Sequence, residues 1–185
     1  MYDTSAIRKG LKIEIEGEVY TVVDFLHVKP GKGGAFIRTK LKSLSRGAVI
    51  DKTFRSGEKL GRPDLEEKKM QFIYSADRQY CFMDTETYEQ ILLTPEQLGE
   101  SRNLLKENTV INVLFHNRNP ITVELPTFVE LAISETEPGE RGDTVSGGTK
   151  TARLETGAVI QVPLFLNQGD VVKVDTRTGE YVERA

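Results

Sequence analysis

Apolar and polar residues alternate one by one along the first third of the chain. Leu11, Ile13 and Ile15 are separated by charged residues, and a glycine turn and a β-branched run follow. Alternation with a period of two, interrupted by glycine, is typical of half-buried strands joined as a hairpin. A second hairpin is predicted over residues 25–44 and a last strand over residues 49–54. This succession of short strands predicts a small SH3-like barrel.

The middle third repeats this pattern and adds one short helix. Thr94, Pro95 and Gln97 form the signature of a helix start, with an N-cap threonine, a proline at the first helical position and a glutamine two residues later. Another helical turn is expected over residues 101–106. Strands are predicted over residues 71–74, 80–83, 90–93, 110–115 and 121–125. Five strands with a small helix indicate an oligonucleotide/oligosaccharide-binding (OB) barrel.

The last third again consists of short apolar segments separated by turns. Its strands are predicted over residues 127–133, 150–154, 159–162, 171–174 and 181–182, which again suits a small barrel. Turn-like composition around Pro63 and Pro126 separates the three parts. We therefore predict an all-β chain of three domains, with boundaries at residues 1–63, 64–126 and 127–185.

The charge is distributed unevenly between these three parts. The net charge is +6 over residues 1–63, −5 over residues 64–126 and −4 over residues 127–185, which leaves −3 for the whole chain of 185 residues. A basic first part on an acidic remainder indicates one end that meets a polyanion. Ordinary fluctuation among surface charges remains the alternative explanation.

The sequence offers little for catalysis or metal binding. Cys81 is the only cysteine, and His27 and His116 fall in different predicted domains, so we expect no metal site. No nucleophile motif and no complete phosphate-binding loop is present, and we assign no catalytic residue and no cofactor. No apolar run is long enough to span a bilayer, and the N-terminus lacks the pattern of a secretory signal. We expect a monomeric cytoplasmic protein without a membrane partner.

One glycine-rich segment lies between the two strands of the second hairpin. It reads Lys29, Pro30, Gly31, Lys32, Gly33, Gly34. Three residues without side chains make a thin loop, so Lys32 would be the one long side chain at the apex. Such a loop can enter a narrow cleft and approach a nucleic acid closely, with a mobile cation at its end. From the local sequence alone, an ordinary turn with a solvated lysine explains the segment equally well.

The strand that follows this loop has one basic face. Arg38, Lys40 and Lys42 alternate with apolar or small residues, so their side chains share one side of the strand. Together with Lys29 they could hold a phosphate backbone behind the loop.

Several segments, taken together and in order, resemble the bacterial elongation factor P family. The likeness covers essentially the whole chain, and its strongest part is residues 150–152 with residues 157–166 and Gly169. The other matching segments are residues 29–35, 82–84, 87–90, 142–144 and 174–181. Each segment alone is modest evidence, but their order and separation are highly specific.

The resemblance implies a fold and a function. The fold would be an SH3-like (KOW-like) domain followed by two OB domains, in an elongated L shape. The function would be that of a translation elongation factor without enzyme activity, which binds the ribosome beside the peptidyl-tRNA and relieves stalling at consecutive prolines. The Lys32 loop would point at the CCA end of the tRNA. By the same resemblance, Gly142, Asp143 and Thr144 would meet the small subunit and the mRNA exit-site codon.

The resemblance also implies a modification of the tip residue. Some members of the family glycosylate an arginine there, and lysine excludes that chemistry in this chain. Addition of β-lysine, addition of aminopentanol and an unmodified Lys32 all remain open, and the first two require a Lys32-modifying enzyme as a further partner.

A competing hypothesis is a free single-stranded nucleic-acid binder that uses its OB barrels. This function needs aromatic side chains exposed on a barrel face. Tyr74, Tyr80 and Phe82 are the candidates, although core packing would explain all three.

Overall fold

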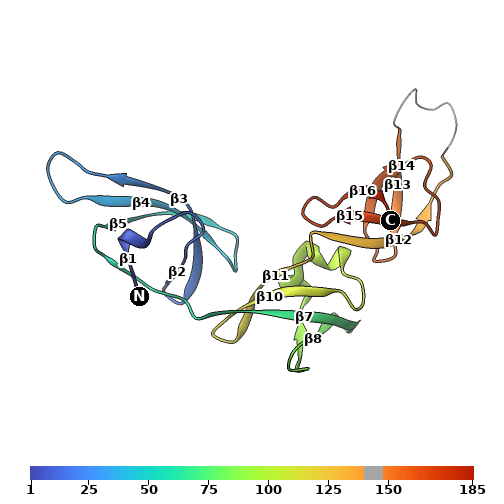
Figure 1. Cartoon of the computed structure of the whole chain (residues 1–185), viewed down its shortest axis with the longest axis horizontal. Coiled ribbons are helices and arrows are strands. Elements are labelled where there is room, and N and C mark those ends of the chain that lie inside the picture. Colours follow the sequence, from blue (N-terminus) through green and yellow to red (C-terminus); the bar gives the residue numbers. More distant parts are fainter. Residues whose placement is uncertain (140–147) are drawn as a thin grey trace. The chain divides into compact units, whose positions relative to one another are not determined.

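The computed structural model describes residues 1–139 and 148–185, and this part of the chain is built almost entirely of β-strands (Figure 1). The all-β class predicted from alternation is confirmed. The chain divides into two compact units. The first unit contains Met1–Glu67 and Leu114–Thr122, and the second contains Lys68–Val113 and Val123–Ala185. These units describe packing, and the domain boundaries at residues 63 and 126 stay a prediction.

A four-stranded antiparallel sheet forms most of the first unit. Its strands are β2 (Lys12–Ile15), β3 (Glu18–Val28), β4 (Phe36–Ser43) and β5 (Val49–Arg55), in the spatial order β2-β3-β4-β5. Three elements were not predicted: the paired short strands β1 (Tyr2–Asp3) and β6 (Lys59–Leu60), and a 3₁₀ helix, η1 (Thr4–Ala6).

The predicted alternation in this unit is confirmed by burial. Ile13 and Leu41 are completely buried, whereas the charged side chains between the apolar positions of β4 are exposed. One side of the sheet therefore packs into a core and the other faces solvent. The buried core residues are Ile7, Leu11, Ile13, Tyr20, Val22, Ile37, Leu41, Phe54 and Leu60.

A second sheet contains the five strands predicted for the middle third. They are β7 (Leu65–Ala76), β8 (Gln79–Asp84), β9 (Gln90–Leu93), β10 (Val110–His116) and β11 (Asn119–Glu124), in the order β11-β10-β7-β8-β9. The helix start is confirmed: Thr94 caps α1 (Pro95–Leu98), and Gln97 completes the capping box. The further helical turn is a 3₁₀ helix, η2 (Gly99–Leu104).

The third sheet contains the strands predicted for the last part of the chain. They are β12 (Phe128–Thr136), β13 (Thr149–Leu154), β14 (Val159–Pro163), β15 (Val171–Asp175) and β16 (Glu180–Arg184), in the order β14-β13-β12-β15-β16. Its core is aliphatic and includes Leu104 at the end of η2. No helix in the described residues is long and apolar enough to cross a membrane.

The tip of the β10–β11 hairpin belongs to the first unit through specific polar contacts. His116 is buried, and its Nε2 lies 3.0 Å from Oε1 of Glu14 on β2. The Asn117 backbone N–H donates to the carbonyl of Asp64 over 3.2 Å. These contacts give His116 a structural place at a strand end.

Candidate nucleic-acid interface

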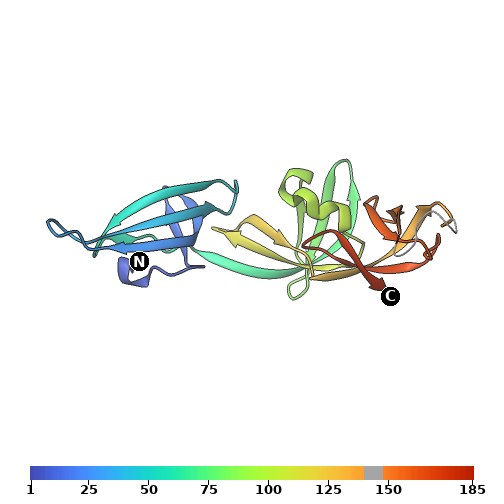
Figure 2. The ribbon, with the colours of Figure 1, turned by 90° about the horizontal axis from the view of Figure 1, so that it is seen from above.

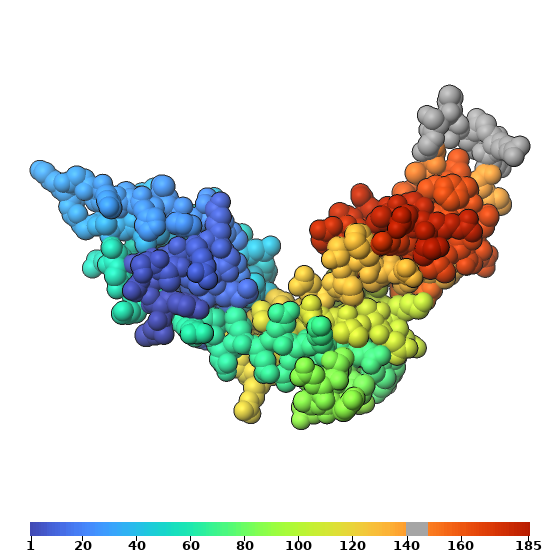
Figure 3. Space-filling view, in the orientation of Figure 1, coloured from blue at the N-terminus to red at the C-terminus, as the bar shows by residue number. Residues whose placement is uncertain are grey.

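The glycine-rich segment forms the loop between β3 and β4. The two strands pair until Val28 lies opposite Phe36, and all six residues from Lys29 to Gly34 are exposed. The loop is the narrow projection at the end of this hairpin (Figures 2 and 3). Within the described part of the chain, no hydrogen bond or ion pair engages the Lys32 side chain. Its amine is therefore free to contact a partner outside the chain.

The three glycines of this loop have different reasons to be glycine. Gly33 has a φ of +102°, a backbone conformation that disfavours side chains. Gly31 and Gly34 have no such φ, and a Cβ added at either would meet no atom within 4 Å. The fold of this protein therefore does not require glycine at positions 31 and 34.

The predicted basic face is the solvent side of the first sheet. Ile37, Thr39 and Leu41 point into the core, so the residues between them point outward. Arg38 lies opposite Leu26 of β3 and Thr53 of β5, without an acidic neighbour on either side. Lys42 lies opposite Thr21 and Val49, which are likewise uncharged.

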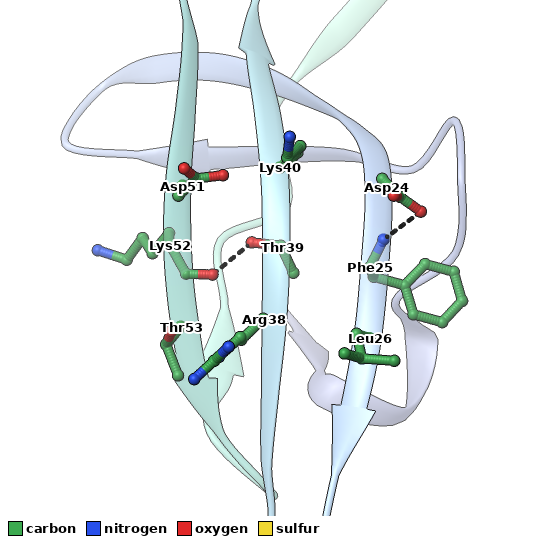
Figure 4. A pocket seen from close by; sticks show the side chains of 9 residues that line it. All are labelled: Asp24, Phe25, Leu26, Arg38, Thr39, Lys40, Asp51, Lys52 and Thr53. Carbon is green, nitrogen blue, oxygen red and sulfur yellow. Dashed lines mark hydrogen bonds between the residues drawn. The ribbon is translucent and has the colours of Figure 1, made fainter.

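Lys40 has different neighbours from the other two cations. It lies opposite Asp24 on β3 and Asp51 on β5, so that one lysine stands between two carboxylates (Figure 4). Cross-strand side chains stand about 5 Å apart at their Cβ atoms, which is close enough to reduce the local positive potential. The positive potential at Lys40 is therefore weaker than at Arg38 or Lys42.

A shallow groove crosses this face between β3, β4 and β5. It has a volume of ≈ 420 Å³. Its lining residues are Asp24, Phe25, Leu26, Arg38, Thr39, Lys40, Asp51, Lys52 and Thr53 (Figure 4). The Thr39 hydroxyl donates to the carbonyl of Lys52 over 2.7 Å, which ties β4 to β5 beneath the groove.

Arg55 is a cation on this face that sequence reasoning missed. It is exposed and lies opposite Phe36, the first residue of β4 and the one closest to the tip loop. Arg38 lies beside the same ring, with its guanidinium carbon 5.7 Å from the ring centre. The alternation Val49, Asp51, Thr53 extends to Arg55, so the signal was present but the predicted strand ended one residue too early.

The opposite end of the β3–β4 hairpin is held by an ionic network. Glu18 at the start of β3 accepts hydrogen bonds from Arg46, from the Ser43 hydroxyl and from the Tyr20 hydroxyl, the last over 3.0 Å. The Arg46 guanidinium, followed by the Ser43 hydroxyl, lowers the pKa of Glu18 to about 2. These groups stabilise the base of the hairpin and take no part in the exposed face.

The sequence also suggested candidates for a small-subunit contact and candidates for base stacking. Gly142, Asp143 and Thr144 lie outside the residues that the structure describes. Of the candidate stacking residues, Phe82 is completely buried and Tyr80 is half-buried against Phe72, which leaves Tyr74 as the exposed ring of the three. The structure thus provides no row of stacking aromatics from this set.

Family models match three consecutive parts of the chain. Residues 3–60 match the elongation factor P KOW-like domain, residues 65–123 the elongation factor P OB domain and residues 129–184 the elongation factor P C-terminal domain. These matches confirm the predicted KOW-like and OB folds.

Curated relatives match over the full length. The chain is 58% identical over 184 residues to elongation factor P of Natranaerobius thermophilus, covering 100% of this chain and 98% of the relative. It is 59% identical over 185 residues to elongation factor P of Moorella thermoacetica, covering 100% of both chains. Among solved structures, the eukaryotic translation initiation factor 5A from Methanococcus jannaschii is similar in fold, with a TM-score of 0.58 at 20% identity, covering 68% of this chain and 92% of that one.

Proposed function

Because this chain belongs to the elongation factor P family, and is therefore a translation elongation factor, we propose that it binds the ribosome beside the peptidyl-tRNA and relieves stalling at consecutive prolines. In this proposal the Lys32 loop positions the CCA end of the tRNA, and the ribosome supplies the catalytic groups. The factor itself contributes no catalytic residue and needs no cofactor.

The observation that carries this proposal is the shape of the tip loop. Gly31 and Gly34 are not required by the fold, yet together with Gly33 they keep the loop narrow on both sides of Lys32. A narrow loop with one long cationic side chain suits a crowded RNA site, where backbone must approach backbone closely.

The basic face behind the loop would hold the acceptor arm of the tRNA. Arg38 and Lys42 are the strongest candidates for phosphate contacts, with Lys29 beside the tip and Arg55 near Phe36. Lys40 would contribute less because Asp24 and Asp51 flank it. Phosphate contacts of this kind fix register and orientation rather than sequence.

Positioning alone can produce a useful acceleration. Holding two reacting groups in an attack-ready geometry lowers the entropic part of the barrier by up to several kcal/mol, and about 1.4 kcal/mol corresponds to a tenfold change in rate. A factor that only orients the tRNA end can therefore relieve a stall without chemistry of its own.

A covalent extension of Lys32 would let its side chain reach further toward the tRNA end. Its amine is exposed and has no partner within the described residues, so a modifying enzyme could add β-lysine or aminopentanol without disturbing the fold. Intact mass measurement of the protein purified from its native host, with the shift mapped to Lys32, distinguishes these two products from a bare lysine.

Three further parts of the proposal concern partners and location. We expect Gly142, Asp143 and Thr144 to contact the small subunit or the mRNA exit-site codon. We also expect the protein to act as a monomer in the cytoplasm. Binding of purified protein to ribosomes carrying peptidyl-tRNA, with and without an occupied exit-site codon, tests the first of these.

The decisive experiment is rescue of a strain that lacks the gene. We expect wild-type protein to restore synthesis of a reporter with consecutive prolines, and Lys32→Ala to fail, while a reporter without prolines is unaffected. Lys59→Ala, which removes an exposed lysine from β6, is the matched control and should rescue fully. Full rescue by Lys32→Ala would reject the tip mechanism.

A further inference from the structure

The outward face of β4 carries charges in three consecutive rows. The first row contains Arg38, the second Lys40 with Asp24 and Asp51 at its sides, and the third Lys42. By formal charge the rows are +1, −1 and +1. Since residues two apart on a strand lie about 7 Å from each other, the two cationic rows are about 13 Å apart.

The two carboxylates are available to a ligand. Both aspartates are exposed, and no ion pair joins Lys40 to either of them within the described residues. Asp24 Oδ1 accepts the Phe25 backbone N–H over 3.0 Å and forms an ion pair with Lys9 Nζ over 3.9 Å. Among the residues that the structure describes, its second oxygen has no such contact. An ionised carboxylate only accepts hydrogen bonds, and it repels phosphate.

A single bulged residue creates this arrangement. Val22 lies opposite Leu41 and Asp24 lies opposite Lys40, so the register shifts at Val23. Without that extra residue an apolar side chain, rather than a carboxylate, would stand beside Lys40. The acidic row is therefore built by the backbone, not merely by local composition.

We propose that Asp24 and Asp51 are specificity-determining residues that make this face selective for A-form RNA. This inference rests on the proposed function. Arg38 and Lys42 hold the two phosphate backbones that border a groove, and the carboxylates between them accept hydrogen bonds from ribose 2′-hydroxyls. The wide, shallow minor groove of A-form RNA presents such hydroxyls, and DNA lacks them.

The test is the affinity of the full chain for an RNA hairpin with a single-stranded end and for a DNA hairpin of the same sequence, measured by fluorescence anisotropy at low salt. We expect the wild-type protein to prefer the RNA by about tenfold or more. In the double variant Asp24→Asn/Asp51→Asn we expect most of this preference to be lost. DNA binding should rise several-fold because phosphate repulsion is removed. On RNA this gain is offset, because neutral amide oxygens accept hydrogen bonds from the 2′-hydroxyls more weakly than carboxylates do.

The matched control is Glu16→Gln/Glu66→Gln, which changes the net charge equally at exposed positions off this face. An unchanged ratio of RNA affinity to DNA affinity in the aspartate variant would overturn the inference. An equal loss of RNA preference in the control variant would overturn it as well. Absence of RNA binding by the wild-type protein would overturn it too, without affecting the ribosome-dependent reporter assay.

A third variant separates the inference from the proposed function. Arg38→Ala/Lys42→Ala should weaken RNA binding and reduce the salt dependence of the affinity by about 1.4 to 1.8 in logarithmic slope. Unchanged RNA affinity in this variant would contradict the docking face of the proposed function. Weaker binding, with an unchanged RNA-to-DNA ratio in the aspartate variant, would contradict only the inference.

Discussion

The two ends of the β3–β4 hairpin are held in opposite ways. At the base, Glu18 binds Arg46, Ser43 and Tyr20, so the start of β3 and the end of β4 are joined by several charge-assisted hydrogen bonds. At the tip, Lys32 has no partner within the described residues. The base satisfies its polar groups internally, whereas the tip leaves its cation for contacts outside the molecule.

The glycines at the two ends show the same difference. Gly47, in the turn at the base, has a φ of +72°, so the turn itself favours glycine. Gly34, at the tip, has neither a positive φ nor a close neighbour. A glycine that the fold needs and a glycine that the fold does not need therefore lie in the turns at opposite ends of β4, and this permits a direct test of what each end does.

The largest effect is expected from added bulk at the tip. Gly34→Leu should reduce synthesis through consecutive prolines by about tenfold or more. The added side chain would displace the tRNA end, and a rise of about 1.4 kcal/mol in the activation free energy is enough for a tenfold loss of rate. The melting temperature should not change. The measurement is the reporter assay in the deletion strain, with a thermal melt of the purified protein.

The control for this variant is Ala48→Leu, which adds similar bulk at an exposed position of the base. It should leave proline-run synthesis intact. Equal loss of activity in both variants would mean that bulk anywhere on the hairpin is harmful, and the comparison between the two ends would not hold.

A smaller effect, on stability rather than function, is expected from the base. Glu18→Gln removes the charge that Arg46 binds, and it should lower the free energy of unfolding of the first unit by about 1–2 kcal/mol. The measurement is urea denaturation followed by NMR signals of β3 and β4. Glu16→Gln, an exposed neighbour in the adjacent turn, should change stability by less than about 0.5 kcal/mol.

If Glu16→Gln lowered the free energy of unfolding as much as Glu18→Gln, the hydrogen bonds of Glu18 would make no specific contribution to stability. Activity offers a second check, since proline-run synthesis by Glu18→Gln should match the wild type at temperatures where the variant is folded.

Replacing Gly47 or Gly34 by alanine should change the free energy of unfolding by a still smaller amount. Gly47→Ala should destabilise the first unit by about 1 kcal/mol, because alanine is strained at positive φ. Gly34→Ala should stay within about 0.5 kcal/mol of the wild type. Urea denaturation of both variants checks this, and a reversed order would contradict the different roles assigned to the two glycines.

Features of the fold that depend on residues close together in the sequence could be predicted, whereas features that depend on contacts between strands could not. The strand faces depend on alternation within a few residues, so the burial of Ile13 and Leu41 was predictable. The capping box at Thr94 is equally local. The weaker positive potential at Lys40 was not predictable, because Asp24 lies beside it only as a result of a bulge in another strand.

The stretch with the strongest family resemblance contains many residues with a structural role. Ala152, Ile160, Val162 and Leu166 in this stretch all lie in the core of the third sheet. Gly169 has a φ of +92°, so its turn favours glycine. Much of this signature thus reflects packing and turn geometry, whereas the glycines at positions 31 and 34 have no such structural reason.

The stability of the base of the hairpin should also change with pH. The pKa of Glu18 is lowered from 4.5 to about 2 in the folded protein, mainly by the Arg46 guanidinium. Since the folded pKa lies below the unfolded one, the stabilisation is complete above the unfolded pKa and is lost as the pH falls through the folded pKa. The difference in unfolding free energy between wild type and Glu18→Gln should therefore shrink as the pH falls from about 5 to about 2. Urea denaturation across this range measures it, and comparison of the two proteins cancels the titration of the other carboxylates. A constant difference would show that the ionised form of Glu18 does not stabilise the base.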